Sequence, residues 1–218
     1  MGKPATQNRQ LRYSATLRES AARRGTGKRH RHKSKTLDEL IENALRLFSE
    51  AGFEETTVDA IAQATGVSRR TFFRYFSSKD DLVLSQFEAM RTFLHERLVE
   101  RPPSEQPLRA MRNSFKALDN ESLAARNRRR RLGELVGEHA SLRGAMLLLQ
   151  EQWEAEIAGV VAQRLKLPAT DARARLTAAC GYAAFRLAST QSRLNGDLKL
   201  GPAIDRYFDL LEKTGCSR

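Results

Sequence analysis

An all-α fold is predicted by three observations on the sequence. Ala, Leu, Arg and Glu, which favour helices, are abundant, whereas Pro occurs only 6 times in 218 residues. After residue 35, apolar residues recur at spacings of three and four, as they do on one face of a helix. No alternating run of β-branched and aromatic residues is bounded by Asn-Gly or Asp-Gly, so the signals for strands and hairpins are missing. An apolar content of 40% is enough to bury a sizeable core.

Residues 1–35 are predicted to form a basic, disordered tail. They hold 11 of the 38 Lys and Arg residues and 1 of the 26 acids, Glu19, which gives +10 and leaves +2 (27 basic minus 25 acidic) for the rest of the chain. A segment this basic, with few large apolar side chains, cannot bury enough surface to offset the entropy of ordering. We expect it to favour polyanions.

Three short helices are expected directly after this tail. They span about residues 37–51, 57–64 and 69–76. The predicted capping residues are Thr36 with Glu39, Thr56 with Asp59, and Ser68 alone. Gly52 closes the first helix and Gly66 supplies the turn between the second and the third. Three helices in about 45 residues form a compact domain of the size of a DNA-binding head.

A long fourth helix is expected from Lys79, capped by Ser78 with Asp81 and ended by Pro102-Pro103. Five further helices are expected at about 104–118, 122–139, 141–166, 169–195 and 201–214. The predicted domains are thus the tail at 1–35, the three-helix domain at 36–82 and a helical body at 83–218.

The last two helices each carry a face that could lie in a monomer core or at the seam of a two-fold dimer. The first has small residues and leucines, namely Leu176, Ala179, Cys180, Ala183, Ala184, Leu187 and Ala188. The second has Ile204, Tyr207, Phe208 and Leu211. Two helices at the chain end have few other neighbours to cover them, which favours a homodimer through residues 169–195 and 201–214.

The helix at 69–76 has the composition of one that enters the major groove of DNA. Such a helix needs guanidinium groups and small hydroxyls near its N-terminus and an apolar face that pins it to a core. The polar groups are Arg69, Arg70, Thr71 and Arg74. Phe72 and Phe76 are expected to be the core pins. A pair of arginines on a helix is elsewhere usually an ordinary solvated face.

Residues 36–84 resemble the N-terminal domain of the TetR/AcrR family of bacterial transcription regulators. The matching segments are ALRLF (44–48), AGFEETTVDAIA (51–62), GVSRRTFFRYF (66–76) and SKDDL (78–82). The resemblance implies a helix-turn-helix DNA-binding domain at 36–82 and an all-helical ligand-binding and dimerisation domain at 83–218. It implies a homodimer that binds double-stranded operator DNA and responds to a small-molecule effector. The form SRRTFFRYF resembles a subgroup of actinobacterial regulators related to the mycofactocin-locus regulator, which implies an acyl-CoA-like effector.

The resemblance also implies which residues contact DNA. These are Thr57, Ser68, Arg69, Arg70, Thr71, Phe73, Arg74, Tyr75 and Lys79. Thr57 and Lys79 would reach phosphates, although Thr57 and Ser68 would be present as plain N-caps without DNA. The family usually has Tyr where this chain has Phe73, so a phenolic hydrogen bond is replaced by apolar contact, for instance to a thymine methyl group.

A body cavity for the effector is predicted from apolar residues together with one arginine. The candidates are Phe87, Met90, Met111, Phe115, Met146, Leu149, Trp153, Phe185 and Arg186. A structural core would use the same residues, and Met and Trp favour an adaptable pocket only weakly. The run Arg126–Arg131 is either a solvated helix end or a cationic rim for an anionic effector.

Other classes of protein fit the sequence poorly. The four histidines are scattered, the two cysteines lack metal-ligand spacing, and no paired carboxylates suggest catalysis, so we expect no enzyme, cofactor or metal. No window approaches the ~18 apolar residues of a membrane span. The expected protein is a soluble, cytoplasmic, nucleoid-associated transcription regulator, namely a repressor that a ligand releases from DNA. An activator and a non-specific architectural DNA-binding protein are the alternatives.

Overall fold

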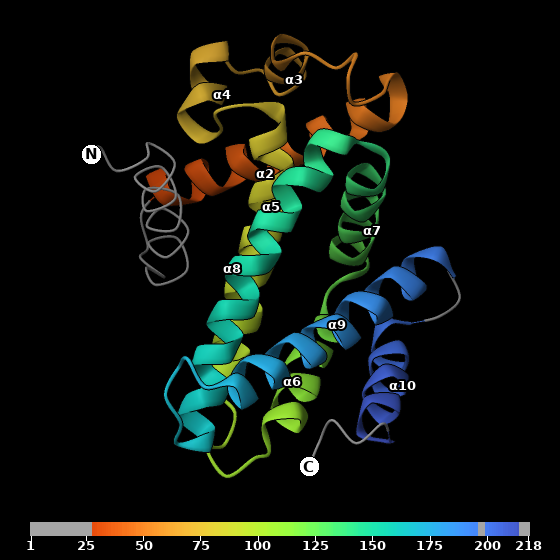
Figure 1. Ribbon diagram of the computed structural model, residues 1–218. Coiled ribbons are helices and arrows are strands. Elements are labelled where there is room, and N and C mark those ends of the chain that lie inside the picture. Colours follow the sequence, from red (N-terminus) through yellow and green to blue (C-terminus); the bar gives the residue numbers. More distant parts are fainter. Residues whose placement is uncertain (1–27, 196–198, 214–218) are drawn as a thin grey trace, which may run out of the picture. The chain divides into compact units, whose positions relative to one another are not determined.

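The computed structural model describes residues 28–195 and 199–213, with side chains from residue 35 onward. Every regular element in these ranges is helical (Figure 1), which confirms the all-α prediction. The helices are α2 (Lys28–Ala51), α3 (Val58–Ala64), α4 (Arg69–Tyr75), α5 (Lys79–Val99), α6 (Pro107–Phe115), the 3-10 helix η1 (Lys116–Asn120), α7 (Leu123–Glu138), α8 (Ala140–Leu165), α9 (Ala172–Leu194) and α10 (Leu200–Lys213). The chain divides between Leu82 and Val83 into two compact units, called unit 1 and unit 2 below.

Helix α2 begins at Lys28, nine residues before the predicted start at 37. Thr36 and Glu39 lie inside this helix, so the predicted capping box does not mark its beginning. Adding a residue to an existing helix costs far less than starting one, and Lys and Arg are good helix formers, so the amphipathic part extends into the basic run. The predicted tail therefore includes helical residues at 28–35, and its residues 1–27 lie outside the described residues.

Helices α3 and α4 form the two short arms of a helix-turn-helix. The Thr57 hydroxyl accepts a hydrogen bond from the Ala60 N–H (3.1 Å) and caps α3. The prediction of Thr56 as the cap was wrong: Thr56 is buried, and its hydroxyl donates to the Gly52 carbonyl (2.7 Å). Gly66 has a φ of +69°, a conformation that suits Gly at the C-terminal end of a helix and confirms its turn role.

The core of unit 1 gathers the apolar faces of α2, α3 and α4 around phenylalanines. Its buried members include Leu40, Ala44, Leu45, Phe48, Phe53, Ile61, Phe72 and Phe76. The Phe48 and Phe53 rings meet edge to face at 4.9 Å, and those of Phe72 and Phe76 lie 5.6 Å apart. The prediction that Phe72 and Phe76 pin α4 to the core is confirmed, and this burial decides which face of α4 remains in solvent.

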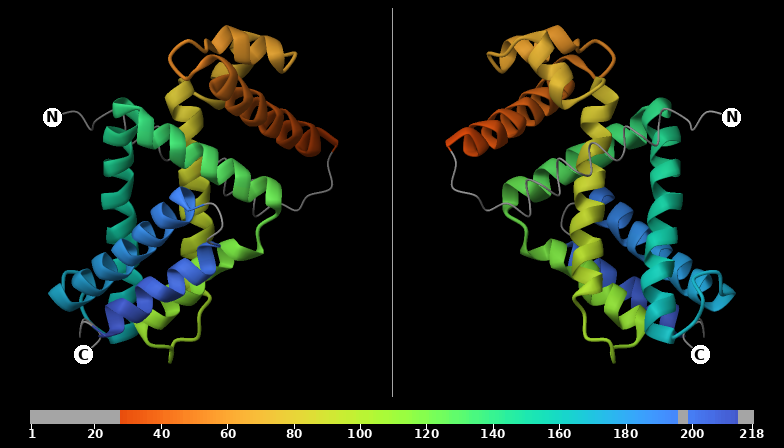
Figure 2. Two further views of the ribbon diagram at one scale, coloured as in Figure 1. Left: turned by 90° about the vertical axis from the view of Figure 1, so that its right-hand side faces the viewer. Right: turned by 90° about the vertical axis from the view of Figure 1, so that its left-hand side faces the viewer.

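The helices of unit 2 occur in the predicted order, with differences at their ends. Pro107 lies in the first turn of α6, where a missing N–H is tolerated, and the end of the predicted helix at 104–118 tightens into η1. Helix α9 starts at Ala172 because the Asp171 carboxylate caps it by accepting from the Arg173 N–H (2.9 Å). Both views of Figure 2, each turned by 90° from that of Figure 1, show α9 and α10 side by side, and α9 also packs on α8 and α6.

The core of unit 2 contains a group of aromatic rings from α6, α8, α9 and α10. The ring centres of Phe115 and Phe185 lie 4.5 Å apart, and those of Trp153 and Tyr182 lie 4.9 Å apart. Gly181 lets α6 approach α9 closely, since a Cβ there would lie 2.8 Å from the Met111 sulfur. In the described ranges no helix has both the length and the apolar character of a membrane span, and no group of His, Cys, Asp and Glu there could hold a metal ion.

Candidate DNA-binding site

Helix α4 has one buried face and one face that is open to solvent. Phe72 on the first face is fully buried. The opposite side carries an open hollow lined by Arg70, Thr71, Phe73 and Arg74. The Phe73 ring is 44% exposed although it is apolar. Guanidinium, hydroxyl and aromatic groups therefore lie together on a surface that the rest of the described part of unit 1 leaves uncovered.

The N-terminus of α4 is held by two hydroxyl groups. The Ser68 Oγ accepts from the Thr71 N–H (3.1 Å) and lies 3.0 Å from the Thr71 Oγ1, so that one of the two hydroxyls donates to the other. The prediction of Ser68 as the cap is confirmed. In this bond one hydroxyl donates and the other keeps its O–H, which is the donor that a DNA contact would use.

The two arginines at the start of α4 differ in their partners. The Arg69 Nη1 donates to the Asp59 Oδ2 of α3 (2.9 Å), and its guanidinium lies 5.5 Å from the centre of the Phe73 ring. Arg70 is exposed and forms no ion pair within the described ranges. The sequence pattern marked Asp59 as a capping residue only, and no local signal links it to a residue ten positions away.

Arg74 and Tyr75 form a second cation–aromatic pair at the end of α4. The Arg74 guanidinium lies 5.2 Å from the centre of the Tyr75 ring, and the Tyr75 ring in turn lies 6.4 Å from Phe76. Tyr75 is half-buried, so only part of it faces solvent. The five predicted contact residues between Arg70 and Tyr75 thus keep at least part of their surface in solvent. Phe72, which lies among them in sequence, is buried.

Lys79, at the first turn of α5, is engaged within unit 1. Its Nζ donates to the carbonyls of Phe53 (2.6 Å) and Glu54 (2.9 Å) and lies 4.6 Å from the centre of the Phe53 ring. These bonds tie the start of α5 to the loop before α3. A phosphate contact by Lys79 remains a prediction. It would be made by an N–H of the ammonium group that does not donate to these carbonyls.

The predicted cavity residues of unit 2 occupy three kinds of environment. Met111, Phe115, Met146, Trp153 and Phe185 are buried. Phe87, Met90 and Leu149 are half-buried, and Arg186 is exposed. Since the rings of Phe115, Trp153 and Phe185 pack against one another, they serve the core in this structure.

Tyr182 was missed as a member of this aromatic group. It lies three residues before Phe185 on the same face of α9, so helical spacing could have identified it. Burial raises the pKa of its phenol well above the ordinary value, while the nearby Arg186 guanidinium acts in the opposite direction. Its hydroxyl therefore stays protonated at neutral pH.

The arginine run of α7 is partly neutralised by neighbouring acids. Arg129 Nε lies 3.2 Å from a Glu121 carboxylate oxygen, and Arg130 lies 3.9 Å from Glu134. Arg126 is exposed. Of the two interpretations of this run, a solvated helix end accounts for the contacts of Arg129 and Arg130, and a cationic rim is left with fewer members.

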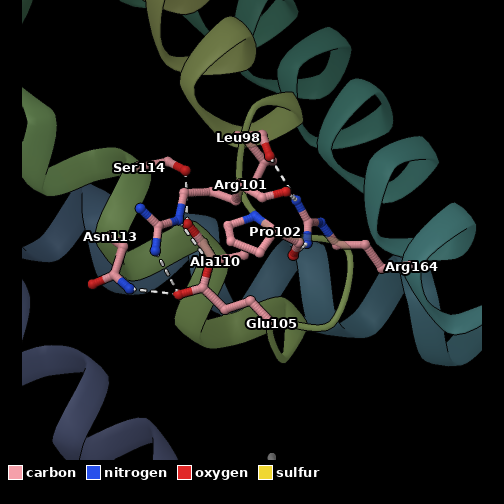
Figure 3. Close-up of polar contacts among 8 residues, drawn as sticks. All are labelled: Leu98, Arg101, Pro102, Glu105, Ala110, Asn113, Ser114 and Arg164. Atoms are coloured by element: carbon pink, nitrogen blue, oxygen red, sulfur yellow. Dashed lines mark hydrogen bonds and ion pairs between the residues drawn. The ribbon is translucent and has the colours of Figure 1, made fainter.

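Arg164 of α8 binds the last turn of α5 and the segment that follows it, as Figure 3 shows. Arg164 donates to the carbonyls of Leu98 in the last turn of α5 (2.8 Å) and of Arg101 (2.9 Å) and Pro102 (2.7 Å) directly after it. Glu105 accepts from both Arg101 and Asn113. The Arg101 hydrogen bond holds the pKa of the Glu105 carboxyl below its usual range.

Comparison with known proteins identifies the family. A model described as bacterial regulatory proteins of the tetR family matches residues 40–85, and one described as the MftR C-terminal domain matches residues 105–215. The transcriptional regulator TcmR of Streptomyces glaucescens is 35% identical over 191 residues, which cover 81% of each chain. The chain belongs to the tetR family of bacterial regulatory proteins. It is thus a DNA-binding transcription regulator rather than an enzyme.

Other tetR-family relatives agree with this placement. MftR of Mycobacterium tuberculosis is 31% identical over 144 residues, covering 65% of this chain and 71% of MftR. The solved structure of the fatty acid degradation regulator FadR from Bacillus halodurans has a TM-score of 0.58 at 16% identity and covers 84% of this chain and 97% of its own. Regulatory protein TetR from Rhodobacter sphaeroides has a TM-score of 0.50 at 23% identity, covering 81% and 96%. At these identities the two structures support the fold alone.

Proposed function

We propose that this regulator is a homodimeric repressor that a small-molecule effector releases from its operator. The observation that carries the proposal is the exposed surface of Arg70, Thr71, Phe73 and Arg74 on α4, whose other face is pinned by Phe72. A short helix held in this way can lie in the major groove, with its guanidinium forks directed at guanine and its apolar groups at thymine methyls. Repression would then take place on the chromosome, in the cytoplasm.

Unsatisfied apolar surface on α9 supports the dimer. Leu176, Leu187 and Leu194 are at least half exposed, and with Cys180, Ala183 and Thr190 they follow spacings of four and three along one face. Leu210 of α10, which packs beside α9, is 48% exposed as well. Leucines repeated at this spacing are typical of a helix that packs against another helix.

The effector is proposed to act through α5, which starts in unit 1 and continues in unit 2. The first turn of α5 holds the loop before α3 through Lys79. Further along, Arg91 bonds Glu88 of the same helix and Glu156 of α8, and Arg164 of α8 donates to the Leu98 carbonyl in the last turn of α5. A ligand that prefers one arrangement of α8 relative to α5 would bias the position of the heads without touching DNA.

An elongated amphipathic anion, such as a long-chain acyl-CoA, is the proposed effector class. The aromatic and methionine side chains of unit 2 would accept its apolar part after rearrangement of the core. Exposed Arg126 and Arg186 would meet its phosphates or carboxylate. This proposal is tested by titrating acyl-CoAs of increasing chain length into the operator complex. If no acyl-CoA in the series releases the protein from DNA or changes its melting temperature, this ligand class is excluded.

Selection from a library of randomised duplexes tests the DNA-binding part of the proposal. The purified full-length protein should enrich an inverted repeat whose half-site centres lie about one helical turn, ~34–36 Å, apart. Binding to the enriched duplex should persist in excess bulk DNA. If bulk DNA competes for the protein as effectively as the enriched duplex does, the protein binds without sequence preference, as an architectural protein would. A reporter placed behind the operator then distinguishes repression from activation.

A further inference from the structure

The ion pair between Asp59 and Arg69 is not required by the fold of unit 1. Both side chains are more than 60% exposed, and neither belongs to the core. Exposed pairs of this kind contribute little to the stability of a fold, because water screens the charges and both side chains lose freedom. What the pair does is geometrical: it connects the first turn of α3 with the first turn of α4.

The pair also determines where the Arg69 guanidinium lies. Arg69 and Phe73 are four residues apart on α4 and therefore share a face. With Asp59 on one side and the Phe73 ring 5.5 Å away on the other, the guanidinium has two fixed neighbours. Arg70, the next residue, is exposed and has no ion pair within the described ranges. Two chemically identical side chains thus enter the candidate interface with different freedom.

We infer that Asp59 is a positioning residue that restrains Arg69 and so limits binding to DNA that lacks the operator sequence. A free arginine at the edge of a recognition helix binds any phosphate, which adds affinity without sequence preference. Arg69 held over Phe73 instead presents one fixed surface to the groove, and base reading by a guanidinium falls to Arg70. The inference rests on the proposed function, because it assumes that α4 binds the operator.

The test compares Asp59→Asn with the wild-type full-length protein on two duplexes, the selected operator and a scrambled duplex of equal length. On scrambled DNA each freed Arg69 should add one phosphate contact. For a dimer, the slope of log affinity against log salt should steepen by about 1.8. By the same relation, the gain in affinity should shrink about 12-fold between 50 and 200 mM salt. On the operator the gain should be smaller, because Arg69 also loses its place over Phe73.

Two variants separate positioning from a simple change of charge. Glu55→Gln removes one exposed acid from the same unit without touching Arg69, and it should leave the ratio of operator to scrambled affinity unchanged. In an Arg69→Gln background, Asp59→Asn should have no more effect than Glu55→Gln. Arg69→Gln by itself breaks the pair from the other side, and it should not raise the affinity for scrambled DNA.

The outcomes are distinct from those that test the proposed function. A wild-type protein that prefers no duplex would remove the proposed function itself. If the wild type prefers its operator but Asp59→Asn changes both affinities equally, or keeps its effect without Arg69, the positioning role of Asp59 is wrong. Melting temperatures near the wild-type value show that the variants are folded. Asp59→Ser, which keeps a hydroxyl in the first turn of α3, repeats the test if Asp59→Asn unfolds.

Discussion

At the scale of single residues, neighbours rather than residue type decide what each cationic side chain does. Arg69 is paired with Asp59, while Arg70 has no such partner in the described part of the chain. Lys79 donates to two backbone carbonyls, so it stabilises a loop of unit 1 before it meets any DNA. A family position by itself would assign all three to DNA in the same way.

Arg70→Ala should weaken operator binding while leaving the fold intact. If Arg70 makes a bidentate contact with a base, the loss is about 1–3 kcal/mol per contact, which a gel-shift titration measures. The side chain is exposed, so the melting temperature should stay within a degree or two. Arg46→Ala removes another exposed cation, from α2, and serves as the control. Equal operator affinity for Arg70→Ala and the wild type would remove Arg70 from the interface.

Glu105→Gln should lower stability at neutral pH but not at low pH. The folded-state pKa of Glu105 is depressed by Arg101, so its contribution is present above the unfolded pKa of about 4.3 and is lost as the pH falls through the folded value. The gap in melting temperature between variant and wild type should therefore be wide at pH 7 and close below about pH 4. A gap that stays constant with pH would mean that the charge of Glu105 plays no part.

At the scale of elements, α9 is the helix on which unit 2 is assembled. It packs on α6, α8 and α10, and it combines a buried aromatic face with an exposed leucine stripe. Close approach of α6 requires the missing side chain at Gly181. At the next junction, the Asp119 carboxylate accepts from the Gly201 N–H (2.9 Å) and caps α10 from a distance of 82 residues in sequence.

Gly181→Ala should destabilise unit 2 even though Ala favours helices. The new Cβ would meet the Met111 sulfur at 2.8 Å, and overpacking of this kind costs about 1–3 kcal/mol. Gly144→Ala, in α8, meets nothing within 4 Å and should stabilise by up to about 1 kcal/mol through helix propensity. Urea unfolding of the matched pair measures both. Stabilisation in both variants would show that Met111 moves aside without cost.

At the scale of the whole molecule, two properties matter: assembly with a second copy and the distribution of charge along the chain. The three leucines of the α9 stripe, Leu176, Leu187 and Leu194, are left exposed by the described part of the chain, and we propose that a second copy covers them. The net charge of +12 lies mostly at the N-terminal end, where residues 1–27 contribute +5 (six basic minus one acidic) and residues 28–35 another +5.

Leu187→Glu should convert the dimer into a monomer. It places a charge in the middle of the α9 stripe, where a partner helix would have to desolvate it. Light scattering should report half the mass, and operator affinity should fall at least about 100-fold because each head would then bind alone. Leu147→Glu, on α8 with 59% exposure, is the control that should stay dimeric. A dimeric Leu187→Glu protein would place the interface elsewhere.

Deleting residues 2–27 should reduce the salt dependence of operator binding without removing sequence preference. The cut ends before α2, so the described part of unit 1 is kept. If three cationic residues per subunit contact phosphates, the slope of log affinity against log salt loses about 5 units in magnitude for a dimer. An unchanged slope would show that residues 2–27 do not touch DNA. A lost preference for the operator would show that specificity lies in the tail rather than in α4.

The sequence by itself determined the fold class, the order of the helices and several of their ends. Helix periodicity, the Ser68 cap and the turn at Gly66 each depend on residues within one or two turns of one another, so a local pattern carries them. The burial of Phe72 and Phe76 followed from the same periodicity. The family followed from the spacing of residues 44–82.

Only the tertiary structure decided which of these residues are free to act. Thr57 rather than Thr56 caps α3 because Thr56 is buried and bonded to Gly52, and α2 begins early because helix extension costs little. The partners of Arg69 and Lys79 lie 10 and 25 or more residues away. Periodicity reports one helix at a time, whereas hydrogen bonds and ion pairs form between helices, and these contacts exist only once the chain has folded.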